Sequence, residues 1–243
     1  MRRKAGRSRG GARTTRGRRI ALFGGTFDPV HAGHLAVARA AQRRFHLDQV
    51  VFVPSARPPH KNCAELLPFV HRYAMVALAC SEDPRFMPSL IEAGPDGTGE
   101  EIFYSVDTVR KFRQTSCSSG DQLYFLLGAD SFLQIATWKD YPTLLTLCDF
   151  VVANRPGFRS KMLYEAVPTE LLAASLGPSH RTISRGPISI ALRGTTVHLL
   201  EAVSSRVSAT NVRRRLEHGQ SVHGLVPRGV EDYIKKQALY RNG

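Results

Sequence analysis

Short apolar runs alternate with apolar stripes at helical spacing along most of the chain. Runs that are ended by glycine, proline or polar residues predict buried strands over 19–23, 49–53, 123–127, 150–153 and 196–200. Apolar residues at helical spacing predict helices over 33–45, 68–80, 103–112, 211–217 and 229–239. This repeated alternation favours the α/β class, as one domain with a doubly wound parallel sheet and closing C-terminal helices.

Positive charge is concentrated at the N-terminus. The 243 residues carry a net charge of +14, and nine of those positives lie in residues 1–19, which contain no acidic residue; the rest of the chain carries +5. We therefore expect residues 1–18 to form a disordered basic tail and residues 19–243 to form the domain. Nonspecific nucleic-acid binding through this tail is the alternative function class, although the tail lacks the aromatic residues that such modules use.

The remaining composition excludes several other classes. No window approaches 18 consecutive apolar residues, so we expect no membrane span. The four cysteines are widely spaced and form no CxxC pair, so neither a zinc site nor a redox pair is indicated. Without a secretory signal pattern we expect a cytoplasmic protein with reduced thiols, and association into a homo-oligomer is left open.

Unusual residues follow the first predicted strand. Gly24 and Gly25 let the backbone pass close to a ligand, and His31 and His34 stand three residues apart at the start of the next helix. Two imidazole donors aimed at one place suit the charge that develops on a transferred phosphoryl group. The alternative is one capping and one packing histidine.

Three further groups are candidates for binding. Asp130, after the strand that ends at Gly128, is either a hydroxyl acceptor or a helix cap. Trp138 is either an aromatic wall for a planar ring or part of the core. Ser208, Thr210 and Arg213 open a helix with hydroxyls and a guanidinium, which suits a phosphate, although a capped helix with a solvated basic face is equally consistent.

Together these motifs resemble the nucleotidylyltransferase superfamily and, within it, the bacterial nicotinate-nucleotide adenylyltransferases. The resemblance covers roughly residues 19–240 and includes Gly24-Gly25-Thr26-Phe27-Asp28-Pro29, His31-x-Gly33-His34, Pro58-Pro59-His60-Lys61, Arg72-x-x-Met75, Trp138-Lys139, Arg155-Pro156-Gly157 and Ser208-x-Thr210-x-x-Arg213. The chain departs from the family where Phe103-Tyr104-Ser105 replaces Ser-Tyr-Thr and where Ala209 replaces the middle serine of Ser-Ser-Thr.

The resemblance implies a Rossmann-like nucleotidylyltransferase domain that transfers the adenylyl group of ATP to nicotinate mononucleotide. The products are nicotinate adenine dinucleotide and pyrophosphate; Mg²⁺ arrives with ATP, and no metal ligand is assigned to a protein side chain. Nicotinamide mononucleotide or another phosphorylated acceptor is the alternative substrate.

The same resemblance implies roles for named residues. His31 and His34 contact the ATP phosphates as the catalytic pair. Other residues bind the rest of ATP: Gly24, Gly25, Thr26, Phe27, Gly128, Asp130, Ser208, Thr210 and Arg213. A third set binds the nicotinate nucleotide: Lys61, Ser105, Trp138 and Arg155.

Overall fold

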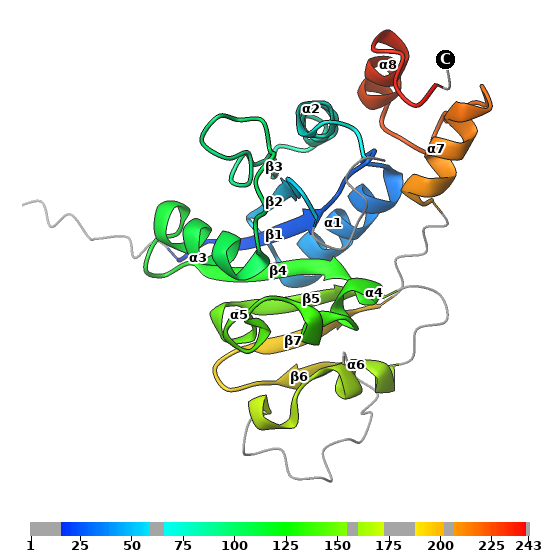
Figure 1. Ribbon diagram of the computed structural model, residues 1–243. Coiled ribbons are helices and arrows are strands. Elements are labelled where there is room, and N and C mark those ends of the chain that lie inside the picture. The colour runs from blue at the N-terminus through cyan, green and yellow to red at the C-terminus, as the bar shows by residue number, and fades with distance from the viewer. Residues whose placement is uncertain (1–15, 59–65, 155–159, 173–187, 202–206, 242–243) are drawn as a thin grey trace, which may run out of the picture.

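The computed structural model describes residues 16–58, 66–154, 160–172, 188–201 and 207–241. Their centre is a seven-stranded sheet in the order β3-β2-β1-β4-β5-β7-β6, which Figure 1 shows from β3 to β6. The strands are β1 (Arg19–Gly25), β2 (Gln49–Pro54), β3 (Phe86–Pro88), β4 (Gln122–Gly128), β5 (Asp149–Ala153), β6 (Ser189–Ala191) and β7 (Thr196–Leu200). All neighbouring strands pair in parallel except β6, which is antiparallel to β7.

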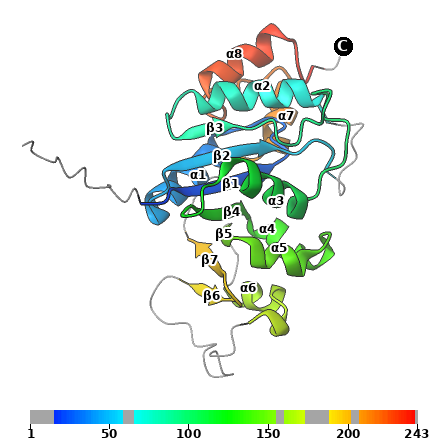
Figure 2. The ribbon, with the colours of Figure 1, turned by 90° about the vertical axis from the view of Figure 1, so that its left-hand side faces the viewer.

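Helices cover both faces of this sheet (Figure 2). The α-helices are α1 (Ala32–Phe45), α2 (Phe69–Cys80), α3 (Ser105–Ser116), α4 (Ala129–Phe132), α5 (Tyr141–Leu147), α6 (Ser160–Ala166), α7 (Ala209–Glu217) and α8 (Arg228–Lys236). Core residues of α1, α2, α7 and α8 join one apolar cluster, and those of α3 to α6 join the other. Short 3₁₀ helices lie at Ile135–Thr137 and Thr169–Leu171.

Strand β1 shows why the apolar runs are continuous. Successive side chains of a strand point to opposite faces, and both faces here are covered. Ile20 and Leu22 pack into the cluster under α3 to α6, while Ala21 and Phe23 pack into the cluster under α1 and α2. A central strand therefore needs apolar residues at every position.

The predicted fold class is confirmed, and each of the five predicted strands and five predicted helices is present, with bounds shifted by a few residues. The sequence did not predict β3 or β6, which are three residues long. It also did not predict the short helices α4 and α5 or the 3₁₀ helix between them. The antiparallel β6 adds an edge strand to the parallel sheet that we expected.

The last residues of the predicted tail lie against the amino ends of the strands. The Arg18 guanidinium is 2.6 Å from Asp121 and also donates to the carbonyl of Ser116, and its backbone N–H donates to Asp121. The Arg18 guanidinium holds the pKa of Asp121 at about 2. Residues 1–15 lie outside the described residues, so their predicted disorder stays a prediction. None of the helices described is long and apolar enough to cross a membrane.

Candidate active site

A pocket of about 550 Å³ opens at the carboxyl ends of the central strands. The ends of β1, β2, β4 and β5 all contribute lining residues. The pocket lies where the strand order reverses, because β1 is flanked by β2 on one side and by β4 on the other. Ligands of open α/β sheets bind at such a reversal, and the volume is typical of a small-molecule or cofactor site.

Two stacked histidines form one wall of this pocket. The rings of His31 and His34 are 3.7 Å apart between centroids and inclined by 25°. His31 is 7% exposed and caps α1, and its backbone N–H donates to Nδ1 of His34 over 3.2 Å. The ring of Phe27 stands edge-on to His34 at 4.9 Å. The structure therefore combines the two interpretations of this pair: His31 caps the helix, and both rings line the pocket.

The backbone beside the histidines is held by glycine and by a buried arginine. A Cβ atom on Gly25 would lie 2.9 Å from the ring of Phe27, so any larger residue here would have to displace that buried ring. Arg72 is 2% exposed, and its guanidinium donates to four backbone carbonyl oxygens. One belongs to Thr26 after β1 (2.9 Å), and two belong to Ser55 (2.6 Å) and Ala56 (2.8 Å) after β2. The fourth belongs to Leu67, just before α2 (2.9 Å). One guanidinium thus fixes the loops that follow two neighbouring strands.

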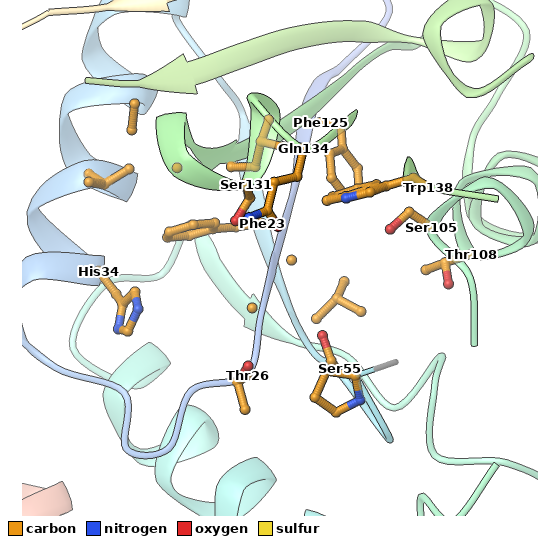
Figure 3. A pocket seen from close by; sticks show the side chains of 18 of the residues that line it. Phe23, Thr26, His34, Ser55, Ser105, Thr108, Phe125, Ser131, Gln134 and Trp138 are labelled. Atoms are coloured by element: carbon orange, nitrogen blue, oxygen red, sulfur yellow. The ribbon is translucent and has the colours of Figure 1, made fainter. Parts of the chain in front are cut away.

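The opposite side of the pocket is aromatic and lies next to α3 and the 3₁₀ helix Ile135–Thr137. Figure 3 shows Trp138 near Ser105 and Thr108, across the pocket from His34. Trp138 is half-buried and packs edge-on against Phe125, with centroids 6.3 Å apart. Lys139 also lines the pocket; its ammonium lies 2.9 Å from Asp107 and 4.4 Å from the centre of the Tyr104 ring. Trp138 therefore gives this side of the pocket an aromatic surface.

A buried carboxyl group lies beneath this aromatic side. Glu92, 8% exposed, accepts from Oγ1 of Thr108 at 2.7 Å and from the backbone N–H of Ala56 at 3.3 Å. Burial raises the pKa of Glu92 to about 7, although these hydrogen bonds and the nearby Arg72 act in the opposite direction. Glu92 therefore changes charge near neutral pH.

A third part of the lining lies beyond the ends of β4 and β5. Gly128, Ser131, Asn154 and Val207 meet here. A Cβ atom on Gly128 would contact nothing within 4 Å, so the cavity is open above it. Oδ1 of Asn154 is buried and has no hydrogen-bond partner among the described residues, which leaves it as an acceptor for a ligand donor.

The structure brings most of the predicted site residues together. Those that line the pocket are Gly24, Gly25, Thr26, His31, His34, Gly128, Ser105 and Trp138. The side chain of Phe27 is buried behind His34, and Asp130 is exposed in the first turn of α4, whose cap is Gly128. Both lie beside the lining rather than in it.

The residues at the start of α7 that we predicted to bind phosphate also lie beside the pocket. Ser208 caps α7 by accepting from the N–H of Asn211 at 3.2 Å, Thr210 is exposed, and Nη1 of Arg213 donates to the carbonyl of Asp28 at 2.7 Å. Their neighbour Val207 is in the lining. Lys61 and Arg155 lie outside the described residues.

Sequence reasoning missed several lining residues, including Ser55, Glu92, Gln134 and Asn154. Asn154 directly follows a predicted strand, so the rule that placed Gly128 at the site also applied to it. Glu92 lies in a loop with no local pattern, and the sequence offered no signal for it.

The reversal of the sheet, the stacked histidines and the aromatic side of the pocket fit the class of α/β proteins that bind nucleotides. The family model described as "Cytidylyltransferase-like" matches residues 22–215. The chain is 39% identical to a protein of Moorella thermoacetica named "Probable nicotinate-nucleotide adenylyltransferase", over 93% of this chain and 94% of that one. It is 37% identical to a protein of the same name from Geobacter sulfurreducens, over 90% and 96% of the two chains.

The structure is also similar to a solved structure of the Plasmodium falciparum nicotinic acid mononucleotide adenylyltransferase complexed with NaAD. The TM-score is 0.67 at 17% sequence identity, over 92% of this chain and 97% of that chain, which shows a common fold. A second structure of that enzyme, complexed with APC, gives a TM-score of 0.65 at 17% identity over the same shares of the two chains. The chain belongs to the cytidylyltransferase-like family and, within it, to the nicotinate-nucleotide adenylyltransferases.

Proposed function

We propose that this protein transfers the adenylyl group of ATP to nicotinate mononucleotide, giving nicotinate adenine dinucleotide and pyrophosphate in NAD biosynthesis. The observation that carries the proposal is the stacked pair His31 and His34, which lines a pocket whose far side is the Trp138 wall. The names of the relatives and the two ligands in the structures of the Plasmodium enzyme support it.

The chemical step joins two phosphates without a covalent intermediate on the protein. An oxygen of the 5′-phosphate of the mononucleotide attacks the α-phosphorus of ATP in line. The new P–O bond forms as the bond from the α-phosphorus to the α,β-bridging oxygen breaks, and pyrophosphate leaves with that electron pair. The protein contributes by holding both nucleotides in place and by neutralising charge that develops on the phosphates.

The hydrogen bond between the two histidines supports Nε2 of His34 as the atom that donates to the phosphates. Nδ1 of His34 accepts the backbone N–H of His31. A neutral imidazole that accepts at Nδ1 carries its proton at Nε2. His34 is therefore set to donate from Nε2 to a phosphate oxygen, and His31 donates beside it.

We assign the remaining contacts with ATP to three segments around the histidine pair: the end of β1 with the loop after it, the end of β4 and the start of α7. Gly24, Gly25, Thr26 and Phe27 offer backbone amides to the reacting phosphates. Gly128 and Asp130 receive the adenosine at the end of β4, where the open space above Gly128 and the acceptor Oδ1 of Asn154 favour a bound nucleoside. Ser208, Thr210 and Arg213, at the first turns of α7, hold the β- and γ-phosphates.

The acceptor nucleotide takes the aromatic side of the pocket. The pyridine ring packs against Trp138, and Ser105, at the first turn of α3, offers a hydroxyl and a backbone amide. Lys61 and Arg155 complete this subsite in the proposal.

Family members of this kind use a divalent metal with ATP, and we propose Mg²⁺. Within the described residues, no group of three or more His, Cys, Asp or Glu side chains is placed to hold a metal ion. Mg²⁺ commonly retains waters and binds through nucleotide phosphates, so the arrangement fits an ion that arrives with ATP. Such an ion would neutralise phosphate charge during the transfer; that no protein side chain ligates it stays a prediction.

The proposal is tested by incubating the purified protein with ATP and one acceptor at a time, and measuring pyrophosphate release. The acceptors are nicotinate mononucleotide, nicotinamide mononucleotide and phosphopantetheine. We expect the highest kcat/KM with the nicotinate form. A strong preference for the amide form would overturn the substrate assignment, and release with none of the three would overturn adenylyl transfer to these acceptors.

A further inference from the structure

The loop between β1 and α1, residues 26–31, is held from outside the pocket by the C-terminal part of the chain. This loop carries Phe27, whose φ of +50° lies in the left-handed region that aromatic residues rarely adopt. Such a conformation persists where surrounding contacts fix it. Because the ring of Phe27 packs edge-on against His34, the conformation of this loop also sets the position of a histidine that lines the pocket.

Three contacts from the C-terminal part converge on this loop and its junction with α1. The hydroxyl of Tyr240 donates to Oδ1 of Asp28 over 2.5 Å, and the guanidinium of Arg213 donates to the carbonyl of the same aspartate over 2.7 Å. The carbonyl of Leu225 accepts the backbone N–H of Ala32, next to His31, at 2.8 Å. Asp28 is 2% exposed, and its second oxygen accepts the N–H of Leu67 at 3.4 Å.

The chemistry of the Tyr240–Asp28 contact makes it a strong restraint. Burial first, and then the Asp28 carboxylate, raise the pKa of Tyr240, so its hydroxyl remains protonated and donates throughout the physiological range. A hydrogen bond from a hydroxyl to a buried carboxylate is stronger than a neutral one. Arg72 and Arg213 lie close enough to act on Tyr240, so the buried carboxylate has cationic neighbours.

We propose that Tyr240 is a positioning residue: through its hydrogen bond to Asp28 it fixes the loop that carries Phe27 and thereby holds His31 and His34 in register with the phosphates. Tyr240 touches no substrate in this account. The expected effect of Tyr240 on turnover rests on the proposed function. Its expected effect on the positions of the two histidine rings does not.

The same C-terminal region offers a matched control. Tyr233 in α8 also forms a hydroxyl hydrogen bond with another element, to Nδ1 of His71 in α2 at 2.9 Å. Tyr233→Phe therefore removes one hydrogen bond of α8 without touching the loop, whereas Tyr240→Phe removes the one to Asp28. Both substitutions keep the ring, so both variants should fold.

The first readout is kinetic, with ATP and nicotinate mononucleotide varied separately. We expect Tyr240→Phe to lower kcat about tenfold, because catalysis depends steeply on the placement of the donors, with both KM values changed by less than about twofold. Tyr233→Phe should retain wild-type kcat. Equal kcat in Tyr240→Phe and the wild type, or an equal loss in both variants, would overturn the positioning role.

The second readout does not depend on activity. In protein labelled with ¹³C-histidine, and assigned with His31 and His34 variants, Tyr240→Phe should shift or broaden the ring signals of His31 and His34. Tyr233→Phe should shift the signal of His71 and leave those two in place. Unchanged His31 and His34 signals in Tyr240→Phe would overturn the inference even if turnover fell. If the wild type released no pyrophosphate but the signals moved as expected, the proposed function would fail and the positioning role would stand.

Discussion

Glu92→Gln should change how the stability of the protein depends on pH. The wild-type carboxyl group is buried beneath the pocket, and burial raises its pKa from 4.5 to about 7. The folded state therefore retains a proton that the unfolded chain releases between these two values. A group whose pKa is raised on folding stabilises fully below the unfolded value, and its contribution is lost as the pH rises through the folded value.

The size of this loss follows from the two pKa values. Each unit of difference corresponds to about 1.4 kcal/mol, so Glu92 should remove about 3.5 kcal/mol in all from the free energy of unfolding, most of it as the pH rises from 4.5 to 7. Glutamine does not titrate and should lack this loss. The substitution also changes the hydrogen bond that the backbone N–H of Ala56 donates to Oε2 of Glu92. This change acts at every pH, so it shifts the free energy of unfolding of the variant by the same amount throughout.

Urea unfolding at pH 5, 6, 7 and 8 measures the effect directly. The stability of the wild type relative to Glu92→Gln should fall by about 2.5 kcal/mol across this range, because part of the loss has already occurred at pH 5. Glu100→Gln, which removes a carboxylate from an exposed loop position, is the matched control and should run parallel to the wild type. Parallel curves for the wild type and Glu92→Gln would refute the reasoning, because the carboxyl would then have the same pKa in both states.

Three other substitutions test the pocket and the residues that support it. Gly128→Ala should leave the melting temperature unchanged, because the added methyl enters open space and the φ of −75° is ordinary for alanine. The same methyl occupies the proposed adenosine position, so KM for ATP should rise about tenfold or more. Gly25→Ala should instead lower the melting temperature, and the reverse pattern in a thermal melt would contradict both assignments. Arg72→Lys should lower the free energy of unfolding by about 3 kcal/mol, because an ammonium cannot serve the four carbonyls and leaves buried acceptors unpaired. Urea unfolding of this variant measures the loss, and wild-type stability would show that the carbonyls need no guanidinium.

The parts of the fold and site that sequence reasoning predicted are those encoded locally. Uninterrupted apolar runs predict β1 and β4, because a strand covered on both faces needs apolar residues at every position. The position of Gly24, Gly25 and the histidines followed in turn, because they directly succeed such a strand. Short edge strands such as β6 carry too few residues to produce a pattern.

The parts that sequence reasoning did not predict depend on contacts between distant residues. Tyr240 and Asp28 are 212 positions apart, and nothing near either residue indicates the other. The sequence placed Arg72 in a motif, but its four carbonyl partners became visible only when the loops after β1 and β2 were brought together. Likewise, Glu92 is an ordinary loop carboxylate until burial against Thr108 changes its proton affinity.

The most direct test of the central claim is the turnover of His34→Ala with ATP and nicotinate mononucleotide. The account predicts that kcat falls by about 10²-fold or more, because a donor to the transferred phosphate is lost, while the fold stays intact. His218→Ala, at an exposed position at the end of α7, serves as the control and should keep wild-type kcat. Wild-type turnover in a folded His34→Ala protein would contradict the claim that this histidine stabilises the transfer.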